Sequence, residues 1–197
     1  MTTADRQRLV ERAFTDAVEA HRRVLGESPD AILAAADMLV RALRSGGRVL
    51  VCGNGGSAAD SQHFAAELVG RFVRERQAWP ALALTTDTSV LTAVGNDYGF
   101  DRIFARQVEA HGRHGDVLVG ISTSGGSPDV LAAVASARRA GMSCIALTGR
   151  DGGALGAAVD VHLNVPSAST ARAQEVHRTL LHVLCDLVES ELAEGQA

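Results

Sequence analysis

The sequence contains no lysine, and all 19 of its basic residues are arginine. Schiff-base enzymes and pyridoxal phosphate enzymes need a lysine amine, and the Walker phosphate loop needs a lysine at a fixed position. These three classes are therefore excluded. The 23 acidic residues outnumber the basic ones and give a formal net charge of −4, which argues against a protein that binds nucleic acid through bulk charge.

Cysteines, aromatic residues and long apolar runs are also scarce. The three cysteines, Cys52, Cys144 and Cys185, form no C-x-x-C pair and lie in apolar segments, so we interpret them as small buried side chains. Aromatic residues make up 4% of the sequence, so small aliphatic side chains must fill the core. The first residues lack the apolar stretch of a signal peptide, and no run approaches the roughly 20 residues of a membrane span. We expect a cytoplasmic protein with reduced thiols and no contact with membranes.

The chain begins with a helical pattern. Apolar residues recur at three- and four-residue spacing over residues 10–24 and again over residues 32–43, which predicts two helices. Between them, Ser28 and Pro29 are typical of an N-cap followed by proline at the first helical position. We expect the second helix to end at the glycine pair 46–47.

From residue 47 on, strand-like and helix-like segments alternate. The expected strands are 48–52, 81–84, 117–121, 143–147 and 161–165, and the expected helices are 57–72, 88–94, 100–111, 128–139 and 170–193. Such alternation predicts right-handed crossovers and a parallel sheet that is covered on both faces. We expect a single domain over residues 1–197: a helical N-terminal extension (1–46), a doubly wound five-stranded α/β core (47–193) that includes a long C-terminal helix, and a frayed end at residues 194–197.

Two loops of similar composition follow predicted strands. The first, Gly53–Ser57, reads GNGGS, and the second, Ser122–Ser127, reads STSGGS. Open parallel sheets bind ligands beyond the carboxyl ends of their strands, where glycines and helix N-termini let backbone N–H groups approach an anion. We expect the two loops to hold a phosphate without lysine. The alternative is that Ser57 and Ser127 only cap helices while the glycines serve tight turns.

The first loop also fits the dinucleotide signature G-x-G-x-x-A through Gly53, Gly55 and Ala58. Its strand follows two helices, and no acidic residue ends a second strand about 20 residues later. A nicotinamide-binding protein is therefore the weaker interpretation, and it leaves the serine-rich second loop unexplained.

The helix after the first loop carries the candidate chemistry. His63 and Glu67 are four residues apart and share one helical face. They can share a metal ion, act as an acid/base pair near a sugar, or form a solvent-facing ion pair of slight energetic value. Asp60 stands where an acid completes a capping box if Ser57 opens the helix, so we assign it a structural role.

The apolar C-terminal helix contains Gln174 and His182. A histidine in such a helix is either a hydrogen-bonded core residue or part of a site. Because the two residues are eight apart, about 12 Å of helix rise separates them and one ion barely reaches both. If both serve one site, we expect one of them to come from another subunit.

Several segments together resemble one family. They are Cys52–Ser57, 63–67 (HFAAE), 94–97 (VGND), 120–125 (GISTSG), 147–153 (LTGRDGG) and 174–177 (QEVH). In order and spacing these resemble the phosphoheptose isomerase family of the sugar isomerase (SIS) superfamily, over almost the whole chain. The resemblance implies a flavodoxin-like SIS domain, a homotetramer with active sites between subunits, and a zinc ion in some members. One departure is Gly126, where members of the family often have asparagine.

The resemblance also implies roles for individual residues. Glu67 and His182 would be the catalytic acid/base groups. The metal ligands would be His63, Glu67, Gln174 and His182. The substrate-binding residues would be Asn54, Gly55, Gly56, Ser57, Glu67, Asn96, Asp97, Ser122, Thr123, Ser124, Ser127 and Gln174. Asn96 and Asp97 come from the resemblance alone, because their pattern by itself is that of a turn.

The implied activity is the aldose–ketose isomerisation of sedoheptulose 7-phosphate to D-glycero-D-manno-heptose 7-phosphate through an enediol, the first step of activated heptose biosynthesis. A rival interpretation is a non-catalytic SIS-domain protein that associates with the bacterial replication initiator, which the chain resembles in Thr86-Asp87 and in residues 185–187 (CDL). That relative lacks acid/base groups matching Glu67 and His182. The presence of both favours the enzyme.

Overall fold

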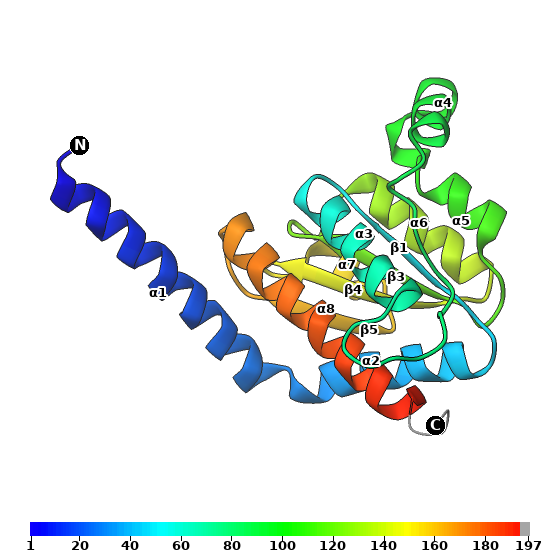
Figure 1. Ribbon diagram of the computed structural model, residues 1–197. Helices are drawn as coiled ribbons and strands as arrows, with labels where there is room; N and C mark the ends of the chain where they lie inside the picture. The colour runs from blue at the N-terminus through cyan, green and yellow to red at the C-terminus, as the bar shows by residue number, and fades with distance from the viewer. Residues whose placement is uncertain (194–197) are drawn as a thin grey trace.

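The computed structural model describes residues 1–193 and has a five-stranded, all-parallel sheet at its centre (Figure 1). The strands are β1 (Val49–Gly53), β2 (Ala81–Ala83), β3 (Val117–Ser122), β4 (Ser143–Gly149) and β5 (Val161–Val165), and their order in the sheet is β2-β1-β3-β4-β5. This order confirms the doubly wound, flavodoxin-like prediction. The chain reverses its direction of travel across the sheet between β1 and β3, which is where such sheets bind ligands.

Eight α-helices and one 3-10 helix are present among residues 1–193. They are α1 (Thr3–Glu27), α2 (Pro29–Arg44), α3 (Gly56–Val69), α4 (Thr88–Tyr98), η1 (Phe100–Arg102), α5 (Ala105–His111), α6 (Pro128–Arg139), α7 (Gly153–Ala157) and α8 (Thr170–Ala193). The expected helix 100–111 is divided into η1 and α5, and the two residues between them, Ile103 and Phe104, are buried in the core. The short α7 was not predicted. The expected fraying of residues 194–197 lies outside the described residues.

The helices cover both faces of the sheet. Alternate strand residues point to opposite faces, so Val51 and Val119 join one core cluster with α2, α3 and α8, whereas Leu50 and Leu118 join another with α5, α6 and α7. Both clusters consist mainly of aliphatic side chains, as the low aromatic content predicts. Cys52, Cys144 and Cys185 are buried free thiols, and burial raises the pKa of Cys144 to about 12. The expectation of small, buried cysteines is confirmed.

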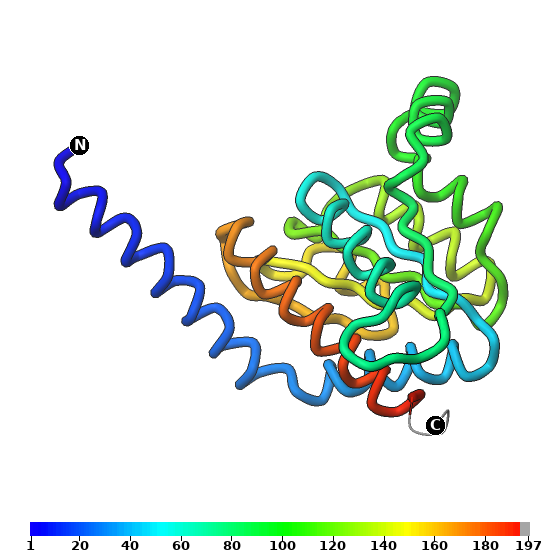
Figure 2. Tube along the Cα trace, in the orientation of Figure 1, coloured from blue at the N-terminus to red at the C-terminus, as the bar shows by residue number. Residues whose placement is uncertain are grey.

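Two helices project from this compact body. Figures 1 and 2 show α1 running away from the sheet toward the N-terminus, and α4 standing out at the opposite side. Leu9, Val10, Phe14 and Val18 of α1 are exposed, and none of the residues of α4 is buried. Within residues 1–193, no helix is both long and apolar enough to cross a bilayer.

Candidate active site

The loop after β1 leads directly into α3. Gly55 is the N-cap of this helix with a φ of +55°, and the helix begins at Gly56. Ser57 therefore lies inside the first turn, and the expectation that it opens the helix is wrong. Asn54 donates from Nδ2 to Oδ1 of the buried Asp129 at 3.0 Å. Because a carboxylate only accepts hydrogen bonds, this contact leaves the Oδ1 of Asn54 available to accept one from a ligand.

The loop after β3 gathers hydroxyl groups. The Oγ of Ser122 lies 2.8 Å from that of Ser127 and 3.4 Å from that of Ser124, which also accepts from the N–H of Gly126 at 3.2 Å. Ser127 occupies the N-cap position of α6, but its side chain makes no capping hydrogen bond. Capping therefore explains neither Ser57 nor Ser127. β1 and β3 are adjacent strands, so the two predicted phosphate loops emerge side by side.

Helices α3 and α8 lie side by side, and side chains connect them at three positions along their length. Gln174 lies against Gly56, where an added Cβ would be 2.5 Å from the Nε2 of Gln174. One turn further along α8, Arg178 donates to the buried Asp60 at 2.7 Å, and one turn beyond that His182 meets His63.

Asp60 thus joins the two helices and takes no part in a capping box. It is four residues into α3, since the helix begins one residue earlier than expected. Gly56, Asp60, Gln174 and Arg178 line an open pocket between the helices. The predicted structural role of Asp60 stands, although its partner is an arginine of α8 and not the helix N-terminus.

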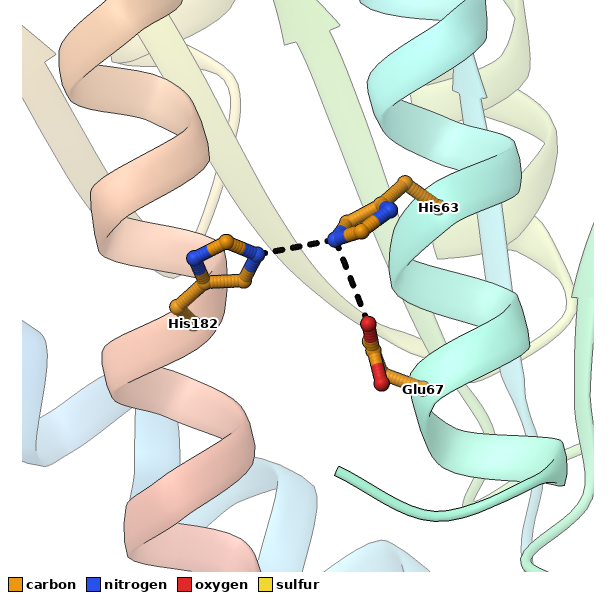
Figure 3. A group of neighbouring side chains, drawn as sticks. All are labelled: His63, Glu67 and His182. Atoms are coloured by element: carbon orange, nitrogen blue, oxygen red, sulfur yellow. Dashed lines mark hydrogen bonds and ion pairs between the residues drawn. The ribbon is translucent and has the colours of Figure 1, made fainter. Parts of the chain in front are cut away.

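His63, Glu67 and His182 form a compact group between the two helices (Figure 3). The Nε2 of His63 lies 2.8 Å from the Nε2 of His182 and 3.3 Å from the Oε1 of Glu67. One ligand atom from each residue lies within 4.8 Å of the other two, and all three residues are half-buried. The structure therefore brings the two predicted catalytic groups together within one chain, across 115 positions of sequence (182 minus 67).

His182 is not the core histidine of α8. That role belongs to His177, which is fully buried and whose Nε2 lies 2.8 Å from the carbonyl oxygen of Thr148. Burial lowers the pKa of His177, so the neutral imidazole is favoured. His182 instead faces a second imidazole and a carboxylate. Neither a simple solvent-facing pair nor a satisfied core histidine describes this group.

Asn96 and Asp97 lie apart from these groups. Both are on α4, where Asn96 donates from Nδ2 to Oδ1 of Asp97 at 2.8 Å. Within residues 1–193 of one chain, no hydrogen bond connects either residue to the two loops or to His63, Glu67 and His182. Their role in substrate binding stays a prediction.

Three residues close to His182 and α3 were missed by the sequence analysis. Phe72 stacks on His182, and Arg76 and Glu189 form a buried ion pair behind it. Residues 70–72 were expected to continue α3, which in fact ends at Val69. Glu189 lies on α8 among other polar residues such as Asp186 and Glu191, so the sequence carried no signal that identifies it or its partners.

The comparisons with known proteins identify one family. The SIS domain family model matches residues 13–149. A phosphoheptose isomerase of Geobacter sp. (strain M21) is 59% identical over 167 residues, which are 85% of this chain and 87% of that protein. The structure of a phosphoheptose isomerase from Neisseria gonorrhoeae is 50% identical with a TM-score of 0.89, covering 93% of this chain and 98% of that one. The structure of a phosphoheptose isomerase from Francisella tularensis is 43% identical with a TM-score of 0.91, covering 97% of this chain and 100% of that one. The chain belongs to the phosphoheptose isomerase family of SIS-domain proteins.

Proposed function

We propose that this protein is an aldose–ketose isomerase that converts sedoheptulose 7-phosphate into D-glycero-D-manno-heptose 7-phosphate. The observation that carries the proposal is the meeting of Glu67 with His63 and His182, on the helix that starts at the first phosphate loop. The relatives described above are named for this activity, which supports an enzyme over a replication-associated binding protein.

The phosphate end of the sugar is held by the two loops at the β1/β3 switch point. The N–H groups of Ser57, Ala58 and Ala59 already donate to the carbonyl oxygens of Asn54 and Gly55. The donors without a lysine are therefore the N–H groups of Gly55 and Gly56 and the hydroxyls of Ser122, Thr123, Ser124 and Ser127. Gln174 lies against Gly56, which supports assigning it to the sugar just beyond this end. The carbonyl end of the sugar then points along α3 toward Glu67 and His182.

The reaction moves one proton between carbons and one between oxygens. Starting from the ketose, a base removes a proton from C1, the C1–C2 double bond forms, and the C2 carbonyl oxygen takes up a proton to give the enediol. Return of a proton to C2 and loss of the proton on the C1 hydroxyl then give the aldose. Glu67 and His182 provide one carboxylate and one imidazole for these transfers, which is the usual chemistry of such groups.

The same three residues fit a zinc ion. Two imidazole nitrogens and a carboxylate oxygen are preferred zinc ligands, and these atoms lie within 4.8 Å of one another. Bound zinc acts as a Lewis acid and stabilises negative charge on the substrate oxygens. Gln174 as a further ligand stays a prediction, because its amide lies at the Gly56 end of α3, two turns of α8 from His182.

Zinc binding can be measured directly. Competition with a chromophoric chelator should give about one ion per chain, and His63→Ala should weaken the affinity by at least tenfold because one of the imidazole ligands is lost. Histidine 111 is exposed at the end of α5, so His111→Ala serves as the matched control and should leave the affinity unchanged. Equal affinities in the two variants would contradict the assignment of this site.

The proposed assembly is a homotetramer with active sites between subunits. The apolar side chains of Leu9, Phe14 and Val18 on the projecting α1 support it, as does α4, which has no buried residue in one chain. A site between subunits also explains why Asp97 does not meet the catalytic groups within one chain. Sedimentation at micromolar concentration should give the mass of four chains, and a monomer at that concentration would contradict the assembly.

The buried free thiols support a reducing compartment, the cytoplasm.

The activity itself is tested by incubation with sedoheptulose 7-phosphate. We expect NMR spectra to show the aldose phosphate accumulating to equilibrium, and solvent deuterium entering at C2 because the enediol exchanges protons with water. Other ketose phosphates serve as specificity controls. No conversion with or without added zinc would overturn the proposal and favour the non-catalytic binding protein.

A further inference from the structure

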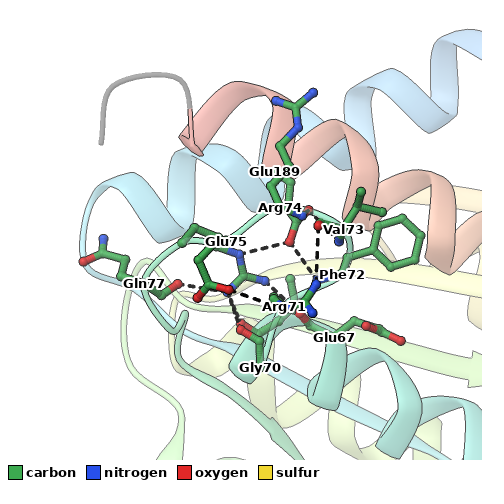
Figure 4. A network of polar contacts seen from close by, with 11 residues as sticks. Glu67, Gly70, Arg71, Phe72, Val73, Arg74, Glu75, Gln77 and Glu189 are labelled. Atoms are coloured by element: carbon green, nitrogen blue, oxygen red, sulfur yellow. Dashed lines mark hydrogen bonds and ion pairs between the residues drawn. The ribbon is translucent and has the colours of Figure 1, made fainter. Parts of the chain in front are cut away.

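Residues 70–79, between α3 and β2, form neither helix nor strand, yet a buried ion pair anchors them (Figure 4). The Nε of Arg76 lies 3.2 Å from Oε1 of Glu189, on the last part of α8, and each side chain is only 1% exposed. Burying two charges costs free energy that their attraction barely returns, so such a pair is weak evidence for stability. The contacts that Arg76 and Glu189 make with the rest of the chain indicate a role other than stabilising the fold.

The Glu189 carboxylate fixes the backbone of the segment. It accepts hydrogen bonds from the N–H groups of Phe72, Val73 and Arg74 at 2.8, 3.0 and 2.9 Å. Burial raises the pKa of Glu189, but these three donors and Arg76 outweigh it and leave the pKa below its ordinary value. The carboxylate is therefore ionised at neutral pH and holds three consecutive residues in one conformation.

Arg76 fixes the end of α3. Its guanidinium donates to the carbonyl oxygens of Glu67, Leu68 and Gly70 at 2.7, 2.8 and 3.1 Å, and it lies 3.7 Å from the centroid of the Trp79 ring. The last carbonyls of a helix have no partner within the helix, so this contact caps the turn that carries Glu67.

The anchored segment places one side chain in the active site. The ring of Phe72 stacks on the imidazole of His182, with centroids 5.5 Å apart and planes 29° apart. His182 thus contacts two rings, that of Phe72 and that of His63, whose centroid is 5.0 Å away. A ring held by two such contacts loses rotational freedom, and its Nε2 stays directed at the Nε2 of His63.

We propose that Arg76 and Glu189 are positioning residues, which act through Phe72 to orient the imidazole of His182 and through the α3 cap to orient Glu67. The inference rests on the proposed function, because it assumes that His182 and Glu67 transfer protons. Groups held slightly out of place cost an enzyme large factors in rate, whereas the binding loops at the other end of α3 are untouched. The pair therefore affects kcat more than KM.

The test compares Phe72→Leu, Phe72→Tyr and Glu189→Gln. We expect kcat to fall by about tenfold or more in Phe72→Leu and in Glu189→Gln, while KM changes less than about threefold. Phe72→Tyr keeps the ring, so its kcat should stay at the parent value. The double variant of Phe72→Leu and Glu189→Gln should lose less than the product of the two single losses, because both act on His182. The control is Val73→Ala, which shortens a 64% exposed side chain and keeps its N–H.

A spectroscopic readout separates positioning from mere stability. With histidine-labelled, metal-free protein, the Hε1 resonance of His182 should move in Glu189→Gln as it does in Phe72→Leu, because the stacked ring has left the imidazole in both. An unchanged resonance in Glu189→Gln together with an unchanged kcat would overturn the inference. If Glu189→Gln does not fold, Phe72→Leu carries the test, since it leaves the ion pair intact.

The two proposals fail differently. Normal turnover in His182→Ala would remove His182 from the mechanism whatever Phe72 does. An inactive His182→Ala protein combined with full activity in both Phe72→Leu and Glu189→Gln would leave the proposed function standing and refute the positioning role alone.

Discussion

Replacing Glu67 by glutamine is expected to lower kcat by about a thousandfold while the fold survives. Glutamine keeps the shape of the side chain but cannot accept a proton, and general acid–base catalysis contributes roughly 10²–10⁴-fold in enzymes. Glu67 is half-buried and its carboxylate lies 3.3 Å from the Nε2 of His63, so the substitution removes a charge without opening a cavity. Steady-state kinetics on sedoheptulose 7-phosphate, with circular dichroism as a check of the fold, measures the effect.

His182→Ala should have an effect of similar size, because it removes the only other predicted proton-transfer group. The matched controls are Glu27→Gln, at the exposed C-terminal end of α1, and His111→Ala, at the exposed end of α5. Both controls should keep turnover within about twofold. Near-normal turnover in either Glu67→Gln or His182→Ala would remove that residue from the mechanism.

The sheet and the position of the ligand site were predictable from the sequence. Strands such as Val49–Gly53 are buried on both faces, so they appear as continuous apolar runs that no amphipathic helix imitates. The loops after β1 and β3 were recognised by their glycines and hydroxyls, and the strand order places them together at the switch point. Local composition carried both predictions because both features are local.

The pairing of distant segments was only partly predictable. The spacing of His63 and Glu67 predicted that they share a helical face, but their contact with His182 depends on how α3 and α8 pack. The resemblance to a family predicted that Glu67 and His182 share one site, whereas the periodicity of the sequence did not. The end of α3 was missed for a related reason: the N–H groups of residues 72–74 bind Glu189, more than 110 positions away in the sequence, and no local pattern signals such an acceptor.

A second large effect is expected at Gly125, in the loop after β3. Its φ is +63°, and an added Cβ would lie 2.1 Å from the carbonyl oxygen of Gly152 and 2.4 Å from its carbonyl carbon. Backbone atoms cannot rotate out of the way as a flexible side chain can. Gly125→Ala should therefore lower the free energy of unfolding by about 3 kcal/mol or more, through backbone strain and overpacking together.

The next residue provides the matched control. Gly126 has no positive φ, and the nearest atom to an added Cβ is the Oγ of Ser124 at 3.9 Å. The free energy of unfolding of Gly126→Ala should therefore lie within about 0.5 kcal/mol of that of the parent protein. Urea unfolding measures both variants. In the folded fraction of Gly125→Ala we expect kcat/KM to fall by about a hundredfold. The reason is that Ser122, Ser124 and Ser127 move with the loop that holds the phosphate. Equal stability and equal kinetics in the two variants would show that the contact with Gly152 does not shape the loop, and the assignment of its hydroxyls to the phosphate would lose its geometric support.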